Sequence, residues 1–251
     1  MVSPGDADEG PGAYLARLAR AAGAEALALV FPVACAGCGA LDATLCVPCE
    51  RMLQPDVRRR IVAGIQVCSG LDFDGVPARV LRALKADGRT GLARALAPAL
   101  AAAVAAAGSP GPEPLLVVPV PTSRAAMRRR GYRVTELLAR RAGVHTIRAL
   151  TSVRATADQR GLSALARAGN VAGSMRAARG APAQLAGRSV LLVDDVVTTG
   201  ATLGEAARAL RAAGAVVTGA ATVAATARRH RPVAADSGTG RLRTGHIATS
   251  A

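Results

Sequence analysis

One stretch of thirteen residues, 190–202, constrains the fold of this chain more than any other. It begins with four apolar residues, Val190 to Val193, and such a short continuous run is typical of a parallel strand covered on both faces. Two adjacent acids, Asp194 and Asp195, come next, and a threonine-rich turn leads into a predicted helix over 203–213. Ligands bind where the strands of open α/β sheets end, so we expect these acids at a ligand site.

The turn after the acids has the chemistry of a phosphate cradle. Gly200 allows a close approach of the backbone, and the free N–H groups at the start of a helix bind anions. The two acids repel a phosphate, but they suit the hydroxyls of a sugar or a magnesium ion. A phosphate at one end and a diol at the other describe a ribose 5-phosphate. The alternative is an ordinary buried strand with a Thr/Gly-rich cap, in which paired acids would be costly.

The segment is similar to the signature of type I phosphoribosyltransferases, which bind phosphoribosyl pyrophosphate (PRPP), and every position of that signature is filled. This resemblance implies that Asp194 and Asp195 hold the ribose hydroxyls, as the catalytic pair if the protein is an enzyme, and that Mg²⁺ accompanies PRPP. It further implies a PRPP-binding loop composed of Val196, Val197, Thr198, Thr199, Gly200, Ala201 and Thr202.

Four cysteines nearer the N-terminus form two C-x-x-C pairs with seven residues between them. Four thiolates at this spacing predict a closed, structural Zn²⁺ site with no open position for catalysis. Gly37 and Gly39 would let backbone amides turn toward the sulfurs. The alternative is disulfide pairing, but no secretory signal is recognisable and a chain of this size needs no disulfide staples. The predicted ligands are Cys35, Cys38, Cys46 and Cys49, whereas Cys68 is expected to be a small core residue or a loosely placed thiol.

A second strand-end loop follows the apolar run 115–121, which breaks at prolines into hydroxyls and arginines. Arg pairs with phosphate oxygens in a bidentate fork, so this loop predicts a seat for pyrophosphate. The alternative for the Arg-rich segment 128–133 is a solvated basic face at the start of a helix over 134–142, where cations oppose the helix dipole. The candidate PRPP-binding residues here are Thr122, Ser123 and Arg124.

Residues 151–180 lack sustained periodicity and are polar and glycine-rich. A long irregular segment inside a compact domain is typically a lid that closes over a ligand, and the alternative is a mobile linker. The lid candidates are Gln159, Arg167 and Asn170.

Coarse periodicity predicts the rest of the organisation. We expect a helix over 13–29, a strand or two over 65–76, helices over 78–107 with a break at 88–91, and a last strand over 215–224. The predicted parts are disordered residues 1–11, the N-terminal helix and zinc module over 12–64, the main domain over 65–227, and a disordered basic tail over 228–251.

The charge of the chain is +15, which raises the question of nucleic-acid binding. This indication is weak, because Lys85 is the only lysine among the 32 basic residues and the chain has only two Tyr, two Phe and no Trp for base stacking. The alanine-rich run 99–107 is too short to span a bilayer, so we expect a soluble, cytoplasmic protein with no membrane insertion.

The order of these motifs resembles the ComF family of competence protein F-like phosphoribosyltransferases. The resemblance rests on the cysteine pairs, Val118 to Pro121, Arg130 to Tyr132, the three lid candidates and the signature, and it extends from about residue 35 to 226. The family pattern also has a lysine after an apolar helical segment, which Lys85 matches and which makes it a PRPP-binding candidate. One departure is Arg133-Val134, where the family usually has Asn-Gln.

The resemblance implies a type I phosphoribosyltransferase-like α/β fold, an open and mostly parallel sheet flanked by helices, with a small four-cysteine zinc module. It implies PRPP binding, with transfer of phosphoribose to a nitrogen acceptor if the protein is catalytic, and a link to DNA uptake. Two alternatives stay open, a non-catalytic PRPP or nucleotide sensor and a competence factor associated with single-stranded DNA or DNA-uptake proteins. A homodimer is common in the fold class, but no residue pattern decides it.

Overall fold

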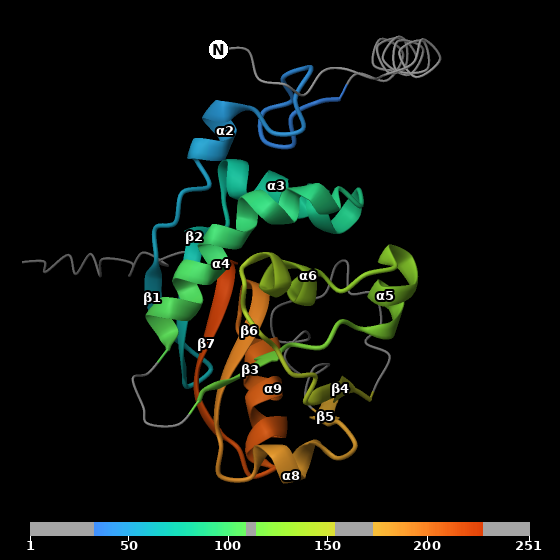
Figure 1. Cartoon of the computed structure of the whole chain (residues 1–251). Helices are drawn as coiled ribbons and strands as arrows, with labels where there is room; N and C mark the ends of the chain where they lie inside the picture. The colour runs from blue at the N-terminus through green and yellow to red at the C-terminus, as the bar shows by residue number, and fades with distance from the viewer. Residues whose placement is uncertain (1–32, 109–113, 154–172, 228–251) are drawn as a thin grey trace, which may run out of the picture.

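The computed structural model describes residues 33–108, 114–153 and 173–227, which form a main sheet, a smaller sheet and the helices around them (Figure 1). The strands are β1 (Arg58–Val62), β2 (Ile65–Asp72), β3 (Leu116–Pro119), β4 (Leu150–Ser152), β5 (Met175–Ala177), β6 (Ser189–Val197) and β7 (Val216–Ala225). The helices are α2 (Val47–Arg51), α3 (Gly75–Ala86), α4 (Ala93–Ala107), α5 (Arg124–Arg130), α6 (Val134–Arg141), α8 (Ala181–Leu185) and α9 (Ala201–Arg211), with a 3₁₀ turn η1 (Thr90–Leu92).

The main sheet has the strand order β1-β2-β7-β6-β3, and its neighbours are parallel except for β1, which pairs antiparallel with β2 at one edge. Strands β4 and β5 form a separate antiparallel pair. The predicted fold class, an open and mostly parallel sheet flanked by helices, is therefore confirmed.

Strand β6 lies inside the sheet and is buried on both faces, as its apolar run predicts. Val190 and Leu192 belong to the core that includes α9, whereas Leu191 and Val193 belong to the core that includes Ala103 of α4. All four of these β6 side chains have no exposed surface. Successive side chains of a strand point to opposite faces of the sheet. Val190 and Leu192 therefore face one helical layer, and Leu191 and Val193 face the other.

Helix α4 packs very closely on the sheet. A Cβ atom added to Gly70 of β2 would overlap the backbone carbonyl of Ala99, so only glycine fits at this crossing. By length and hydropathy alone, the run Thr90–Ala107 could cross a membrane. Within the structure, however, α4 lies against β2, β7 and α6 and buries Leu96 and Leu100 completely, which is the packing of a core helix.

Two local details differ from the sequence-based expectation. The acids lie near the C-terminal end of β6, but the strand continues two residues past them to Val197, because Asp194 and Val196 keep their ladder pairing with β7. The alternative interpretation of the basic segment, a basic face at the start of the helix over 134–142, does not hold for arginines 128–130. They form the last turn of α5, which Gly131 ends in the left-handed conformation at φ 77°. Cations at a helix C-terminus are favourable, so these arginines do not oppose the helix dipole.

Several predictions fall on parts of the chain that the structure does not describe. These are the N-terminal helix over 13–29, the two predicted disordered ends, and the lid candidates Gln159, Arg167 and Asn170. The proposed domain bounds stay predictions.

The close crossing of β2 and α4 generates a stability prediction. Gly70→Ala should lower the free energy of unfolding by about 1–3 kcal/mol, because the new methyl group must push two packed backbones apart. Urea unfolding measures this change. The matched control is Gly91→Ala, since Gly91 is exposed, has open space around its Cα and should tolerate the methyl group. Equal stability of the two variants would contradict the packing described here.

Candidate functional site

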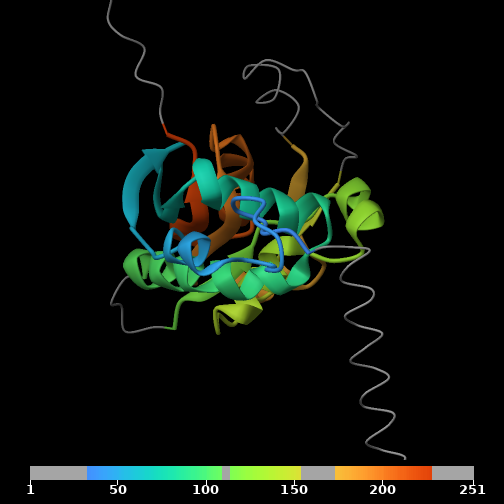
Figure 2. The ribbon, with the colours of Figure 1, turned by 90° about the horizontal axis from the view of Figure 1, so that it is seen from above.

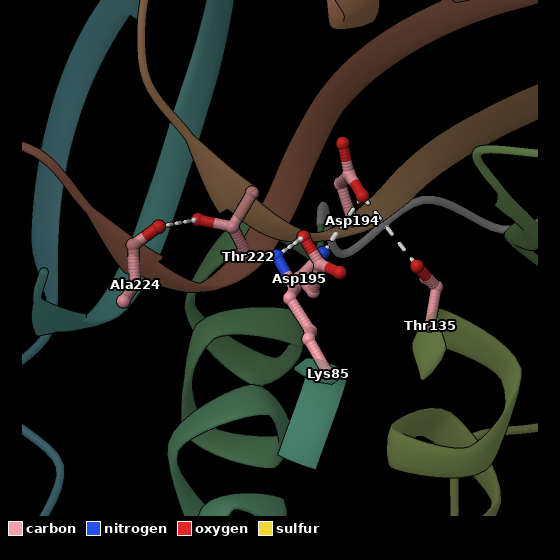
Figure 3. A network of polar contacts seen from close by, with 6 residues as sticks. All are labelled: Lys85, Thr135, Asp194, Asp195, Thr222 and Ala224. Atoms are coloured by element: carbon pink, nitrogen blue, oxygen red, sulfur yellow. Dashed lines mark hydrogen bonds and ion pairs between the residues drawn. The ribbon is translucent and has the colours of Figure 1, made fainter. Parts of the chain in front are cut away.

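The acid pair lies in the last third of β6, between β3 and β7. Asp194 is opposite Thr222 of β7, and its Oδ1 accepts a hydrogen bond from the backbone N–H of Asp195 at 2.8 Å. The hydroxyl of Thr135, in the first turn of α6, reaches the same oxygen at 3.5 Å (Figure 3). Strand β6 and helix α6 together therefore fix the position of this carboxylate.

Lys85 of α3 completes a charged triad with the two acids. Its Nζ lies 2.8 Å from Oδ1 of Asp195, and the two side chains are only 25% and 16% exposed (Figure 3). The sequence resemblance predicted a role for this lysine at the ligand, and the structure places it directly against the acid pair, 110 residues away in sequence. This ion pair offsets the negative charge of Asp195.

Asp194 does not share this ammonium directly. Burial, together with the negative charge of Asp195, raises the pKa of Asp194 from its ordinary value to about 7, although Lys85 and the hydrogen-bond donors act in the opposite direction. A carboxyl group with such a pKa changes its charge near neutral pH, which is typical of functional sites.

The turn after β6 has the geometry that its sequence predicts for a phosphate cradle. Thr198 and Thr199 are exposed, and Gly200 adopts the left-handed conformation at φ 81° directly before α9. A Cβ atom at Gly200 would collide with Val62 of the β1–β2 hairpin, so conformation and space both require glycine. Because α9 begins at Ala201, its first N–H groups have no partner within the helix and can donate to an anion.

Arg60 is a residue of this site that sequence reasoning missed. From β1, its Nη1 donates to the carbonyl of Thr226 at 2.7 Å and its Nη2 to the carbonyl of Val197 at 3.0 Å. These two carbonyls follow β7 and end β6, so Arg60 ties both chain segments together beside the phosphate turn. The sequence carries no distinct signal for this role, because arginine is abundant throughout the chain.

The loop predicted to hold pyrophosphate lies beside the acids at the same edge of the sheet. Strands β3 and β6 are parallel with Pro119 opposite Val193, and the N–H of Val120 donates to the carbonyl of Val193 at 2.9 Å. Thr122, Ser123 and Arg124 follow directly. The Ser123 hydroxyl accepts a hydrogen bond from the N–H of Ala126 at 3.2 Å and so caps α5, while Arg124 is exposed. The structure thus brings together the loops after β3 and β6 and the lysine of α3.

The four predicted metal ligands also converge. The Sγ atoms of Cys35, Cys38, Cys46 and Cys49 all lie within 4.8 Å of one another, and Cys46 is 3.6 Å from both Cys35 and Cys38. Tetrahedral zinc bonds of about 2.3 Å place sulfurs about 3.8 Å apart, so the cluster fits a metal ion such as zinc. These distances are far longer than a disulfide bond of about 2.05 Å. Cys68 is fully buried in the sheet core, away from the cluster. Of its two predicted alternatives, the structure supports the small core residue.

Hydrogen bonds from backbone N–H groups to the sulfur of Cys35 stabilise its deprotonated form. Burial raises the pKa of Cys35, but the backbone N–H groups of Cys46, Cys38 and Gly37 outweigh this effect and lower the pKa to about 6. Burial and the neighbouring thiols instead raise the pKa of Cys49 to about 12. A bound metal cation is therefore needed to keep all four thiols deprotonated together.

The cysteine module is joined to the helix that carries Lys85. Arg79 of α3 donates from Nε to the carbonyl of Gly37, and Arg89 donates to the carbonyl of Thr44 at 2.8 Å. Cys35 and Cys49 are buried in the same core as Leu84. Figure 2 shows the module lying across α3. The metal cluster and the acid pair thus share one supporting helix.

Comparisons with known proteins show the family to which the chain belongs. The family model described as "Phosphoribosyl transferase domain" matches residues 125–244. The DNA utilization protein YhgH of Salmonella typhi is 34% identical over 192 residues, which cover 72% of this chain and 79% of that protein. Adenine phosphoribosyltransferase of Mycobacterium marinum is 60% identical over 40 residues, 16% of this chain and 22% of that enzyme.

Among solved structures, the allosteric regulatory enzyme of purine biosynthesis is 23% identical with a TM-score of 0.30, over 54% of this chain and 25% of its own. The match therefore spans a quarter or less of the length of this enzyme and of the adenine phosphoribosyltransferase.

The sheet, the acid pair and the turn after it define a protein with the type I phosphoribosyltransferase fold. Within that class, the chain belongs to the ComF family, which confirms the resemblance that its motifs predict.

The cysteine cluster generates a prediction about metal content. The purified protein should hold about one metal ion such as zinc per chain, and Cys38→Ser should lose most of it because a tetrahedral site then lacks one of its ligands. Elemental analysis by inductively coupled plasma mass spectrometry measures both. Cys68→Ala is the matched control and should keep the metal. A wild type that is folded and free of metal would contradict the assignment.

Proposed function

We propose that this protein binds PRPP together with Mg²⁺ at the edge of the sheet formed by the ends of β3 and β6. The observation that carries the proposal is the placement of the acid pair between an anion-binding turn, 198–202, and a second hydroxyl-bearing loop, 122–124. PRPP has the matching order of groups, because its ribose diol lies between a 5-phosphate and a pyrophosphate.

Each part of the ligand has a matching group in the protein. The N–H groups at the start of α9 and the threonine hydroxyls would hold the 5-phosphate, which complements the positive end of the helix dipole. Asp194 and Asp195 would accept hydrogen bonds from the ribose hydroxyls. The loop after β3 would hold the pyrophosphate, where Mg²⁺ supplies charge neutralisation when it is bound. We further propose zinc as the metal of the cysteine cluster, in a purely structural role.

If the protein is an enzyme, the reaction is a displacement at the anomeric carbon of the ribose. A nitrogen acceptor attacks this carbon and pyrophosphate leaves, through a transition state with positive charge on the sugar. The acid pair would stabilise that charge, because negative carboxylates beside the bound ribose attract a developing positive charge. Such catalysis requires the transition state to be bound better than PRPP itself.

A second candidate function is a PRPP-dependent role in the handling of DNA. It is favoured by the relative named as a DNA utilization protein, and by the basic last turn of α5 directly after the proposed pyrophosphate loop. PRPP would then act as a signal, and single-stranded DNA or DNA-uptake proteins in the cytoplasm would be the partners. In this form the protein binds PRPP without turnover.

The two functions differ in whether pyrophosphate is released. Incubation of the protein with PRPP, Mg²⁺ and a panel of purine and pyrimidine bases should give pyrophosphate with one base if the protein is an enzyme. Binding of PRPP without release supports the signalling role. Binding of single-stranded DNA that weakens steeply with salt and survives loss of both acids would assign the DNA surface to a different part of the molecule.

The acid pair can be tested directly. Asp194→Asn and Asp195→Asn should each weaken PRPP binding about 10- to 100-fold, because each removes a charged acceptor of a sugar hydroxyl. Isothermal titration calorimetry with Mg²⁺ and PRPP measures the affinity, and circular dichroism checks the fold. Glu136→Gln is a control on α6, since Glu136 is paired with Arg148 at 2.5 Å. Normal PRPP binding by both Asn variants would place the site elsewhere.

The raised pKa of Asp194 predicts a pH dependence of binding. A carboxyl group with a pKa of about 7 is mostly protonated at pH 6 and mostly ionised at pH 8, so PRPP affinity should rise about tenfold over that range. The same titration of Asp194→Asn removes this contribution and leaves only the ionisation of PRPP. Identical pH profiles of the wild type and the variant would contradict the role of Asp194.

A further inference from the structure

Lys85 occupies the position that a divalent cation would need in order to bind Asp195. The Nζ–Oδ1 distance of 2.8 Å is that of a direct charge-assisted hydrogen bond. The pair is also withdrawn from solvent, with 25% of the lysine and 16% of the aspartate side chain exposed. A cation that binds this oxygen must therefore compete with the ammonium.

The helix that carries Lys85 is anchored, so the ammonium is held in place. Leu84 has no exposed surface, and its carbonyl accepts a hydrogen bond from the Tyr132 hydroxyl. Arg79 and Arg89 join α3 and the residues after it to the cysteine module. The backbone next to Lys85 is therefore fixed from two sides.

The ammonium changes what the acid pair can bind. A charged carboxylate without a counter-ion attracts a divalent cation, but the ammonium of Lys85 offsets the charge of Asp195. Asp194, whose pKa is about 7, is only partly charged at neutral pH. Mg²⁺ gives up its water ligands reluctantly and is held in proteins by carboxylates together with substrate phosphates, so a carboxylate whose charge is already offset should bind the free ion weakly. The pyrophosphate of PRPP, in contrast, is a strong magnesium ligand that needs no help from the protein.

We propose that Lys85 is a tethered cation that keeps free divalent ions off the acid pair, so that the metal enters only as the metal complex of PRPP. This inference rests on the proposed function for its ligand, but the exclusion of free metal is a property of the ligand-free protein. Lys85 is then a specificity-determining residue, which selects the metal complex over the metal alone. The single lysine of an arginine-rich chain suits this task, because its ammonium is compact.

Manganese is the probe for the test, since electron paramagnetic resonance measures the free ion directly. The zinc-loaded full chain is titrated with Mn²⁺ in the absence of PRPP. We expect the wild type to bind Mn²⁺ no better than an Asp194→Asn, Asp195→Asn variant, and Lys85→Gln to bind it at least about tenfold tighter, because a like charge next to the metal is gone. That gain should disappear in a Lys85→Gln, Asp195→Asn double variant.

The matched control is Arg82→Gln, which removes one positive charge from the same helix. Arg82 lies over the ring of Phe73, 5.4 Å from its centre, and is not paired with the acids. It should leave Mn²⁺ binding at the wild-type level. Equal Mn²⁺ affinity of Lys85→Gln and the wild type, or a gain that Arg82→Gln reproduces, would overturn the proposal.

The wild-type titration can overturn the proposal even if Lys85→Gln fails to fold. Mn²⁺ binding by the wild type that is lost in the double-acid variant would show that Lys85 does not exclude the ion. Because no PRPP is present, this outcome is separate from the proposed function. A protein that excludes Mn²⁺ as expected but never binds PRPP would contradict the proposed function and leave Lys85 as a purely structural counter-ion.

Discussion

The burial of β6 on both faces is the constraint on which the rest of the structure depends. All four residues from Val190 to Val193 are buried, so a slip of the strand by one or two residues toward its start would move Asp194 into a fully buried position. This fixed register carries the acids to one place at the edge of the sheet. It also fixes the turn after β6 and the start of α9, so the first N–H groups of α9 keep their position relative to the acids.

A second chain of contacts reaches the acid pair from outside the sheet. The cysteine cluster supports α3, α3 carries Lys85, and Lys85 neutralises Asp195. The cysteine cluster is distant from the turn after β6 in sequence. Disruption of the cluster should nevertheless loosen α3, the helix whose Lys85 pairs with Asp195. This arrangement gives the small cysteine module a structural reason to accompany the phosphoribosyltransferase fold.

The sequence predicted those parts of the molecule whose signals are local. The apolar run before Asp194, the glycine of the phosphate turn and the spacing of the cysteines each encode their own geometry, and the structure agrees with them. The pairing of Lys85 with Asp195 could not be derived in the same way, because it depends on how α3 packs across 110 residues of chain.

The errors have physical causes of the same kind. The strand was expected to end with the acids, but its ladder pairing with β7 continues to Val197, and Asp194 and Asp195 both have hydrogen-bond or ion-pair partners there. The arginines before Gly131 were assigned to the start of the next helix. A basic turn followed by glycine is in fact a helix-ending signal, and it was available in the sequence. Arg60, whose partners lie at the ends of two distant strands, had no such signal.

The central claim, that the turn after β6 is the phosphate site of a PRPP-binding protein, is tested most directly by hydrogen–deuterium exchange with and without Mg²⁺ and PRPP. The account predicts that the ligand slows exchange at the amides of residues 198–204, where the first N–H groups of α9 would donate to the 5-phosphate. Unchanged exchange in this segment, with protection instead around the surface pocket lined by Arg140, His145 and Arg148, would contradict it.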